Sequence, residues 1–169
     1  RSSDLTTVLP TFYFTMTEQA MLDGAARIRE ASKAGAGKIL SGLYMEAPYM
    51  ASYGSNQRDI LWTGDIRLEE FAHLVDELND YVRIWAICPA RKNIETFMAY
   101  VKEKNPNAIF ALGHSMASAA DCRRVSHFGV KVQTHHNDSG KRPGRAQCTG
   151  GAGCDKYTLY NPDMYAELI

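Results

Sequence analysis

The sequence predicts an α/β fold in which parallel β-strands alternate with α-helices. Short apolar runs alternate with amphipathic stretches, and this unit repeats about every 20 to 45 residues. No shift in composition marks a domain boundary, so residues 1–169 are expected to form a single domain. Repeats of this kind build either an open doubly wound sheet or a TIM-like (β/α)8 barrel, and a complete barrel takes about 250 residues. About six strands are expected, which suits part of such a barrel.

The first half of the chain is expected to hold three strands and two helices. Thr15 and Glu18 have the spacing of a capping box, and apolar residues then recur at helical spacing up to the breaker Gly35-Ala36-Gly37. In chain order, the expected elements are a strand over 6–9 closed by Pro10, a helix from Thr15, a strand over 38–45, a loop over 46–65, a helix with the apolar face Leu68, Phe71, Val75 and Leu78, and a strand over 82–87.

The second half continues the alternation of strands and helices. Asn93 is expected to cap a helix, and either Ser115 or Ser118 to cap the next one, which Gly129 ends. In chain order, the expected elements are a helix through Phe97, Met98 and Val101, a strand over 108–112, a helix carrying Ala119, Cys122 and Val125, a strand over 130–134, a long loop over 136–162, and the start of a sixth strand over 163–169.

The charge balance and the cysteines limit the classes of partner and compartment. Lys and Arg together number 19, as do Asp and Glu, and binding to nucleic acid needs a basic surplus, so no nucleic-acid partner is expected. No apolar run approaches the ~20 residues that cross a bilayer, and no signal-peptide pattern opens the chain. We therefore expect a cytoplasmic protein with no membrane partner. Four free thiols are then expected, at Cys88, Cys122, Cys148 and Cys154.

Three metal-binding residue types stand at the ends of separate expected strands. Glu46 follows the second strand, His114 the fourth and His135 the fifth. The carboxyl ends of parallel strands meet at one edge of a sheet, so these side chains are expected to point at one spot. Two imidazoles and one carboxylate suit zinc with an open water position, or non-haem iron.

Each of these residues also has a structural interpretation. His114 fits a polar loop, Glu46 fits the start of a surface loop, and His135 and His136 are adjacent, so strand alternation would direct them to opposite sides. His73 and His127 lie within helices and are expected to be structural, His127 through the dipole of its helix C-terminus.

Four motifs at these strand ends follow one another in the order and spacing of a known family. They are Thr7-Val8-Leu9-Pro10-Thr11, Gly42-Leu43-Tyr44-Met45-Glu46-Ala47-Pro48, Gly113-His114-Ser115-Met116-Ala117 and Thr134-His135. Together they resemble N-acetylglucosamine-6-phosphate deacetylase, a member of the metal-dependent amidohydrolase superfamily. The resemblance runs from about Thr6 to the end of the chain.

The resemblance implies a (β/α)8 barrel whose divalent metal is held by Glu46, His114 and His135. Zinc is the expected metal and iron the alternative. A divalent metal lowers the pKa of its bound water and polarises an amide carbonyl. The implied reaction is removal of the acetyl group from an N-acetylated amino sugar phosphate, a small-molecule substrate of amino sugar metabolism.

The same resemblance implies that essential parts of the barrel lie outside the chain. The family's His-x-His pair on the first strand would precede Arg1, and its general acid/base aspartate would follow Ile169. The chain is therefore expected to be a central piece of the barrel, with no catalytic residue of its own and no activity alone. An incomplete barrel exposes strand edges, so we expect a homo-oligomer or pairing with the missing barrel segments.

The substrate-binding positions depart from the family pattern. The resemblance assigns this role to Ser55, Asn56, Asn137, Asp138, Lys141 and Arg142. Asn56 stands where the family has a histidine, and Lys141 holds the place of its phosphate-binding arginine, which loses the bidentate geometry of a guanidinium. These departures favour one alternative, an amidohydrolase that acts on another amide or a cyclic imide. A second alternative is a non-catalytic binding or assembly module, in which Glu46, His114 and His135 are structural.

Overall fold

The computed structural model describes residues 5–51, 60–136 and 153–168. In these ranges the strands form one parallel sheet in the sequential order β1-β2-β3-β4-β5-β6. Doubly wound sheets reverse their strand order at a switch point, and this sheet does not, so barrel-type β/α units are the correct architecture. The strands are β1 (Thr11–Tyr13), β2 (Leu43–Glu46), β3 (Val82–Ile87), β4 (Ile109–Leu112), β5 (Val130–Gln133) and β6 (Tyr165–Ala166).

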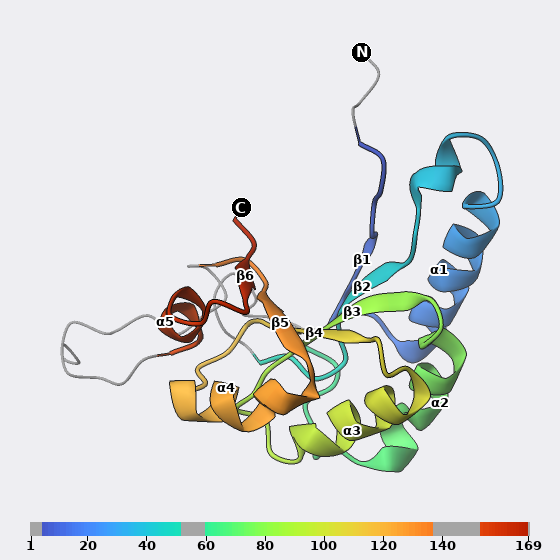
Figure 1. The fold of residues 1–169 in the computed structure, drawn as a ribbon. Helices are drawn as coiled ribbons and strands as arrows, with labels where there is room; N and C mark the ends of the chain where they lie inside the picture. Colours follow the sequence, from blue (N-terminus) through green and yellow to red (C-terminus); the bar gives the residue numbers. More distant parts are fainter. Residues whose placement is uncertain (1–4, 52–59, 137–152, 169) are drawn as a thin grey trace.

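The helices form an arc around the outside of the strands (Figure 1). Each follows a strand and returns the chain to the same end of the sheet, which is what a parallel sheet requires. The helices are α1 (Glu18–Ala31), α2 (Leu68–Leu78), α3 (Ile94–Lys104), α4 (Ala119–Val125) and α5 (Cys154–Leu159), with 3₁₀ turns η1 (Gly35–Ile39) and η2 (Ser126–Phe128). In the part of the chain that the structure describes, none of these helices has the length and apolarity to cross a membrane.

The sheet curls so that strands far apart in its order meet on its inner face. The Tyr44 hydroxyl on β2 contacts Thr134 Oγ1 after β5 and lies 3.2 Å from Glu167 Oε2 after β6. A flat sheet would separate β2 and β5 by three strand spacings, each about 4.8 Å. The inner face is filled by a small apolar cluster of Tyr44, Met50, Ala86, Ala111 and Val132. The sheet thus has the curvature of a (β/α)8 barrel and is open between its edge strands β1 and β6.

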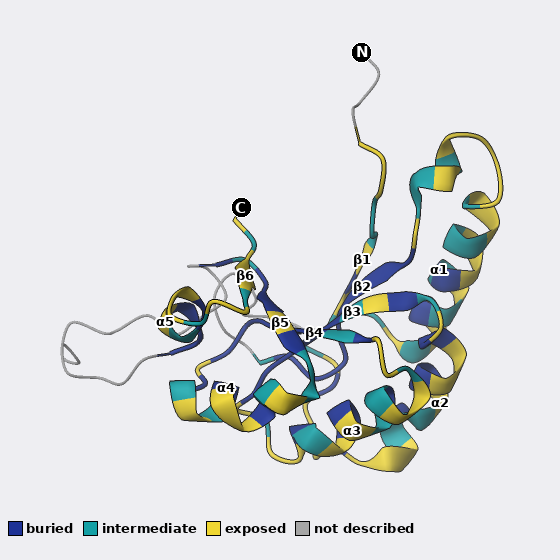
Figure 2. Cartoon of the chain, viewed as in Figure 1, coloured by how far each residue is buried: buried dark blue, intermediate teal, exposed yellow. Residues whose placement is uncertain are grey.

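The larger core lies between the sheet and the helices. Figure 2 shows buried residues along the strands and on the helix faces that turn toward them. An aromatic cluster of Tyr49, Phe71, Trp85 and Phe97 lies at its centre, with neighbouring rings 5.2 to 6.1 Å apart. Burial of these large apolar side chains is the main force that holds α2 and α3 against β3.

Two expectations about the first strand and helix are wrong. The strand lies after Pro10 rather than over 6–9, where Val8 makes only an isolated bridge to Leu40. The Pro10 carbonyl accepts a hydrogen bond from the Tyr44 amide at 3.0 Å, so proline starts the strand instead of closing it. The first helix is capped by Thr17, whose hydroxyl accepts from the Ala20 amide, and not by Thr15.

The middle helices agree better with the sequence. Ser118 caps α4 and forms a capping box with Asp121, which settles the choice between Ser115 and Ser118. Gly129 ends the following turn with φ 87°, a conformation that glycine adopts without strain. Asn93 precedes α3 as expected, but it is left-handed and its side chain makes no capping hydrogen bond.

Helix α5 lies where a loop was expected. It is six residues long, and polar contacts hold it against β5: Asp155 accepts from the Gln133 side chain, and Gln133 in turn contacts His136 Nδ1 at 2.8 Å. All three side chains are buried. A helix this short carries too few apolar positions for a periodic signal, which is why the sequence does not reveal it.

A surface contact between α1 and α2 predicts a pH-dependent stability. His73 Nδ1 lies 2.6 Å from Glu18 Oε1, and this hydrogen bond raises the pKa of His73 above its ordinary 6.5. The folded state therefore binds a proton at His73 more tightly than the unfolded chain does. The stabilisation from the His73–Glu18 contact is complete below about pH 6.5 and is lost as the pH rises through the folded-state pKa of His73. We expect His73→Gln to melt slightly below the unmodified chain at about pH 5.5, with no difference at about pH 9. The same difference at both values would contradict this role.

Candidate metal centre

The structure brings Glu46, His114 and His135 together at one end of the sheet. Glu46 is the last residue of β2, while His114 and His135 each come two residues after the ends of β4 and β5. One possible ligand atom from each residue lies within 4.8 Å of the other two. Parallel pairing places the three strand ends on the same edge, and the curl of the sheet closes the remaining distance.

The distances within this group place its ligand atoms within reach of a single metal ion. Glu46 Oε2 lies 3.4 Å from His114 Nε2, and Glu46 Oε1 lies 2.9 Å from His135 Nε2. Ligands held 2.0–2.1 Å from zinc in a tetrahedron are roughly 3.3 Å apart. Both imidazoles direct Nε2 toward the Glu46 carboxylate, and the two rings meet edge to face with centroids 5.7 Å apart. The donor set therefore fits a divalent metal with a position open to another ligand.

Both histidines have a left-handed backbone, with φ 40° at His114 and 50° at His135. This region is uncommon for residues other than glycine, and such strain concentrates at functional sites. His135 meets Glu46, while His136 is buried against Gln133. The two neighbouring side chains thus diverge, as expected.

The centre is closed on one side and accessible on the other. Glu46 is 3% exposed and His114 is 2% exposed, whereas the side chain of His135 is 33% exposed. Burial alone would raise the pKa of Glu46, but its contacts with His114 and His135 outweigh burial and hold that pKa below its ordinary value. Glu46 is therefore ionised at neutral pH, the form that binds a cation.

A polar cluster beside the centre was not anticipated from the sequence. It consists of Tyr44, Thr134 and Glu167, joined through the Tyr44 hydroxyl. Burial raises the pKa of Tyr44, and burial also raises the pKa of Glu167 above the ordinary value of a carboxyl. One signal was available: Tyr44 and Glu46 are two residues apart on one strand and therefore share its inner face.

Apolar residues complete the wall around His114. Phe14, which follows β1, meets the His114 ring edge to face with centroids 5.9 Å apart. Gly113 packs so closely that an added Cβ would lie 3.1 Å from Met50 Cε and 3.4 Å from Thr134 Cβ. A side chain at position 113 would therefore crowd the strand end that carries His114.

The predicted substrate-binding residues all lie outside the described residues. They are Ser55, Asn56, Asn137, Asp138, Lys141 and Arg142. The described residues on either side of positions 52–59 are anchored by one side chain, because the Arg91 guanidinium donates to the carbonyls of Met50, Trp62 and Gly64 at 3.3, 3.1 and 2.5 Å.

Comparison with solved structures supports the fold. No protein-family model matches the chain, and no curated protein matches it. N-acetylglucosamine-6-phosphate deacetylase from Pasteurella multocida superposes with a TM-score of 0.76 at 21% identity, over 96% of this chain and 40% of that one. The enzyme from Mycobacterium smegmatis superposes with a TM-score of 0.76 at 20% identity, over 96% of this chain and 44% of that one. The enzyme from Thermotoga maritima superposes with a TM-score of 0.73 at 20% identity, over 97% of this chain and 42% of that one.

These likenesses confirm the predicted resemblance at the level of the fold. The chain has the fold of a part of these deacetylases and spans about two fifths of their length.

Proposed function

We propose that this chain is the metal-binding part of an amidohydrolase that removes the acetyl group from an N-acetylated amino sugar phosphate. The observation that carries the proposal is the convergence of Glu46, His114 and His135, with ligand atoms within 4.8 Å, at the strand ends where barrel enzymes hold their active sites. The deacetylase fold of the structural neighbours supports the choice of reaction, and one of them was solved in complex with N-acetyl-D-glucosamine-6-phosphate.

The chain's own residues would hold and orient the reacting groups. Glu46 supplies a buried negative charge, since its lowered pKa keeps it ionised, and His114 and His135 supply the two nitrogens. When bound, zinc would make water a nucleophile near neutral pH and polarise the amide carbonyl. The exposed side of His135 would be the side from which the substrate approaches, while Phe14 packs edge to face against the His114 ring.

We further propose that activity needs segments beyond this chain. Glu46, His114 and His135 would hold the metal, and the resemblance puts the proton-transferring aspartate on a later strand. The edge strands β1 and β6 are the places where such segments would pair.

The test compares this chain with a longer protein that supplies the remaining strands. Both are loaded with zinc, supplied with N-acetylglucosamine-6-phosphate, and assayed for acetate and primary amine. We expect the zinc-loaded longer protein to release acetate at a rate at least about 10⁴-fold above that of its zinc-free control. We expect the chain alone to release none. If the longer, zinc-loaded protein releases no acetate from this substrate, the assigned reaction is wrong.

A substrate panel distinguishes the proposed substrate from the alternatives. Unphosphorylated N-acetylglucosamine tests the phosphate contact, and a cyclic imide tests the alternative amidohydrolase chemistry. Preference for the phosphorylated sugar supports the proposal, and turnover of the imide alone would assign the site to the other substrate class. A folded, zinc-loaded protein that hydrolyses none of them would favour a non-catalytic module.

A further inference from the structure

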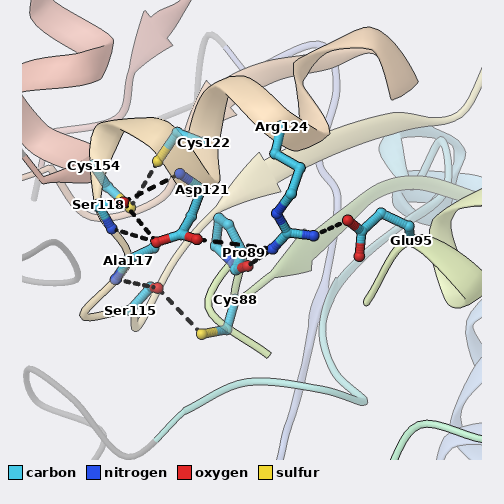
Figure 3. Close-up of polar contacts among 10 residues, drawn as sticks. All are labelled: Cys88, Pro89, Glu95, Ser115, Ala117, Ser118, Asp121, Cys122, Arg124 and Cys154. Carbon is cyan, nitrogen blue, oxygen red and sulfur yellow. Dashed lines mark hydrogen bonds and ion pairs between the residues drawn. The ribbon is translucent and has the colours of Figure 1, made fainter. Parts of the chain in front are cut away.

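A pair of thiols lies between helices α4 and α5. Cys122 Sγ on α4 and Cys154 Sγ, at the first residue of α5, are 3.3 Å apart (Figure 3). Both are fully buried, 0% and 1% exposed, and they are free thiols in this structure. The two sulfurs are therefore in van der Waals contact, with no other group between them.

The backbone around this pair holds the two helices together independently of the sulfurs. Ser118, which caps α4, forms an antiparallel bridge with Gly153, the residue before Cys154. An ordinary disulfide has an S–S bond of about 2.05 Å. Joining the sulfurs thus requires them to approach by about 1.2 Å.

We propose that Cys122 and Cys154 are a disulfide-forming site that ties α4 to α5 under oxidising conditions. The inference does not depend on the proposed function. The disulfide would join residues 32 positions apart and close a loop that contains β5 and His135. Closing a loop of this length removes freedom from the unfolded chain, and the folded state gains stability.

The reaction needs an oxidant, and a small-molecule disulfide such as oxidised glutathione supplies it. One cysteine thiolate attacks a sulfur of the oxidant, releases one glutathione thiolate, and forms a mixed disulfide. The second cysteine thiolate then attacks the protein sulfur of that mixed disulfide and releases the second glutathione. The two cysteines lose two electrons, the oxidant gains them, and the two protons pass through solvent to the released thiolates.

One contact distinguishes this pair from Cys88, the other cysteine in the described residues. Cys88 Sγ donates to Ser115 Oγ at 3.1 Å, whereas the sulfurs of Cys122 and Cys154 contact each other. The neighbouring thiol of Cys122, together with burial, raises the pKa of Cys154, so few thiolates exist at neutral pH and the exchange is slow there. The disulfide is expected to form at alkaline pH or when α5 opens locally.

The test is peptide mapping after oxidation of the unmodified chain. The chain is incubated at about pH 8.5 with oxidised glutathione, quenched in acid, denatured, and treated with an alkylating reagent. We expect Cys88 and Cys148 to be alkylated, and one peptide pair to be joined through Cys122 and Cys154. Alkylation of all four cysteines at equilibrium, or a disulfide between any other pair, would overturn the proposal.

Thermal melting of variants gives a second readout. Oxidation is expected to raise the melting temperature of the unmodified chain by about 5–10 °C. The matched controls Cys88→Ser and Cys148→Ser should show the same rise, and Cys122→Ala should show none. A rise in Cys122→Ala equal to that of the unmodified chain would refute the assignment. If Cys122→Ala does not fold, the peptide map of the unmodified chain still shows whether Cys122 and Cys154 form a disulfide.

Discussion

Replacing His114 and His135 together by alanine is expected to weaken zinc binding by more than about 100-fold. Each histidine contributes one of the three converging ligand atoms, so the double variant leaves only the Glu46 carboxylate. Removing a group that merely orients a metal ligand costs 10- to 100-fold in affinity, and loss of two direct ligands costs more. Zinc affinity is measured by competition with a chromophoric chelator, and bound zinc by elemental analysis of the purified protein.

The chain offers a matched control for this experiment. His73 and His127 lie in α2 and η2, away from the centre, where His73 contacts Glu18 and His127 packs against Phe128. The double variant His73→Ala, His127→Ala removes the same number of imidazoles and should bind zinc as the unmodified chain does. If both double variants bind zinc equally, the ligand assignment is wrong, whatever the affinity.

Thermal stability reports the same binding event. A ligand that binds only the folded state at 100 times its Kd stabilises that state by about 2.7 kcal/mol. For a chain of this size, that corresponds to a rise in melting temperature of about 5–10 °C. The unmodified chain should show this rise with zinc, and His114→Ala, His135→Ala should not. Glu46→Gln should also lose most of the rise, because the amide keeps the shape but removes the buried negative charge.

The three converging residues could be predicted because each stands at the end of a separate strand. The apolar run over 82–87 marks β3 without ambiguity, and Asn105-Pro106-Asn107 marks the turn before β4. Once the strands are known to be parallel, the position of Glu46, His114 and His135 at their carboxyl ends follows from the geometry of the sheet. Local patterns were therefore enough for β3, β4 and β5 and for the convergence of these three residues.

The contacts that were missed join residues far apart in the chain. Tyr44 meets Thr134 and Glu167 across 90 and 123 residues, and only the curl of the sheet brings them together. The contact of Cys122 with Cys154 likewise depends on α5, whose six residues carry no periodic pattern. The first strand was misplaced for a different reason, since Pro10 has no amide hydrogen and so suits either the end or the start of a strand.

The aromatic cluster predicts the largest loss of stability from a single substitution, at Phe97. Its ring is fully buried on α3 and meets Phe71 on α2 at 5.2 Å, Trp85 on β3 at 5.4 Å and Tyr49 at 5.5 Å. Phe97→Ala should lower the free energy of unfolding by about 3–5 kcal/mol, because the removed ring leaves a cavity between rigid neighbours. Urea denaturation followed by circular dichroism measures the change.

Two further variants establish that burial of Phe97 is the cause. Phe97→Leu keeps most of the apolar volume and should cost less than about 2 kcal/mol. Tyr160→Ala removes an aromatic ring that is 83% exposed and should change the free energy by less than about 0.5 kcal/mol. Tyr49 lies three residues after Glu46, so a cavity at Phe97 also loosens the segment that follows this ligand. Zinc affinity in Phe97→Ala should therefore fall together with stability, whereas unchanged stability would show that the cluster does not hold α2 and α3 to the sheet.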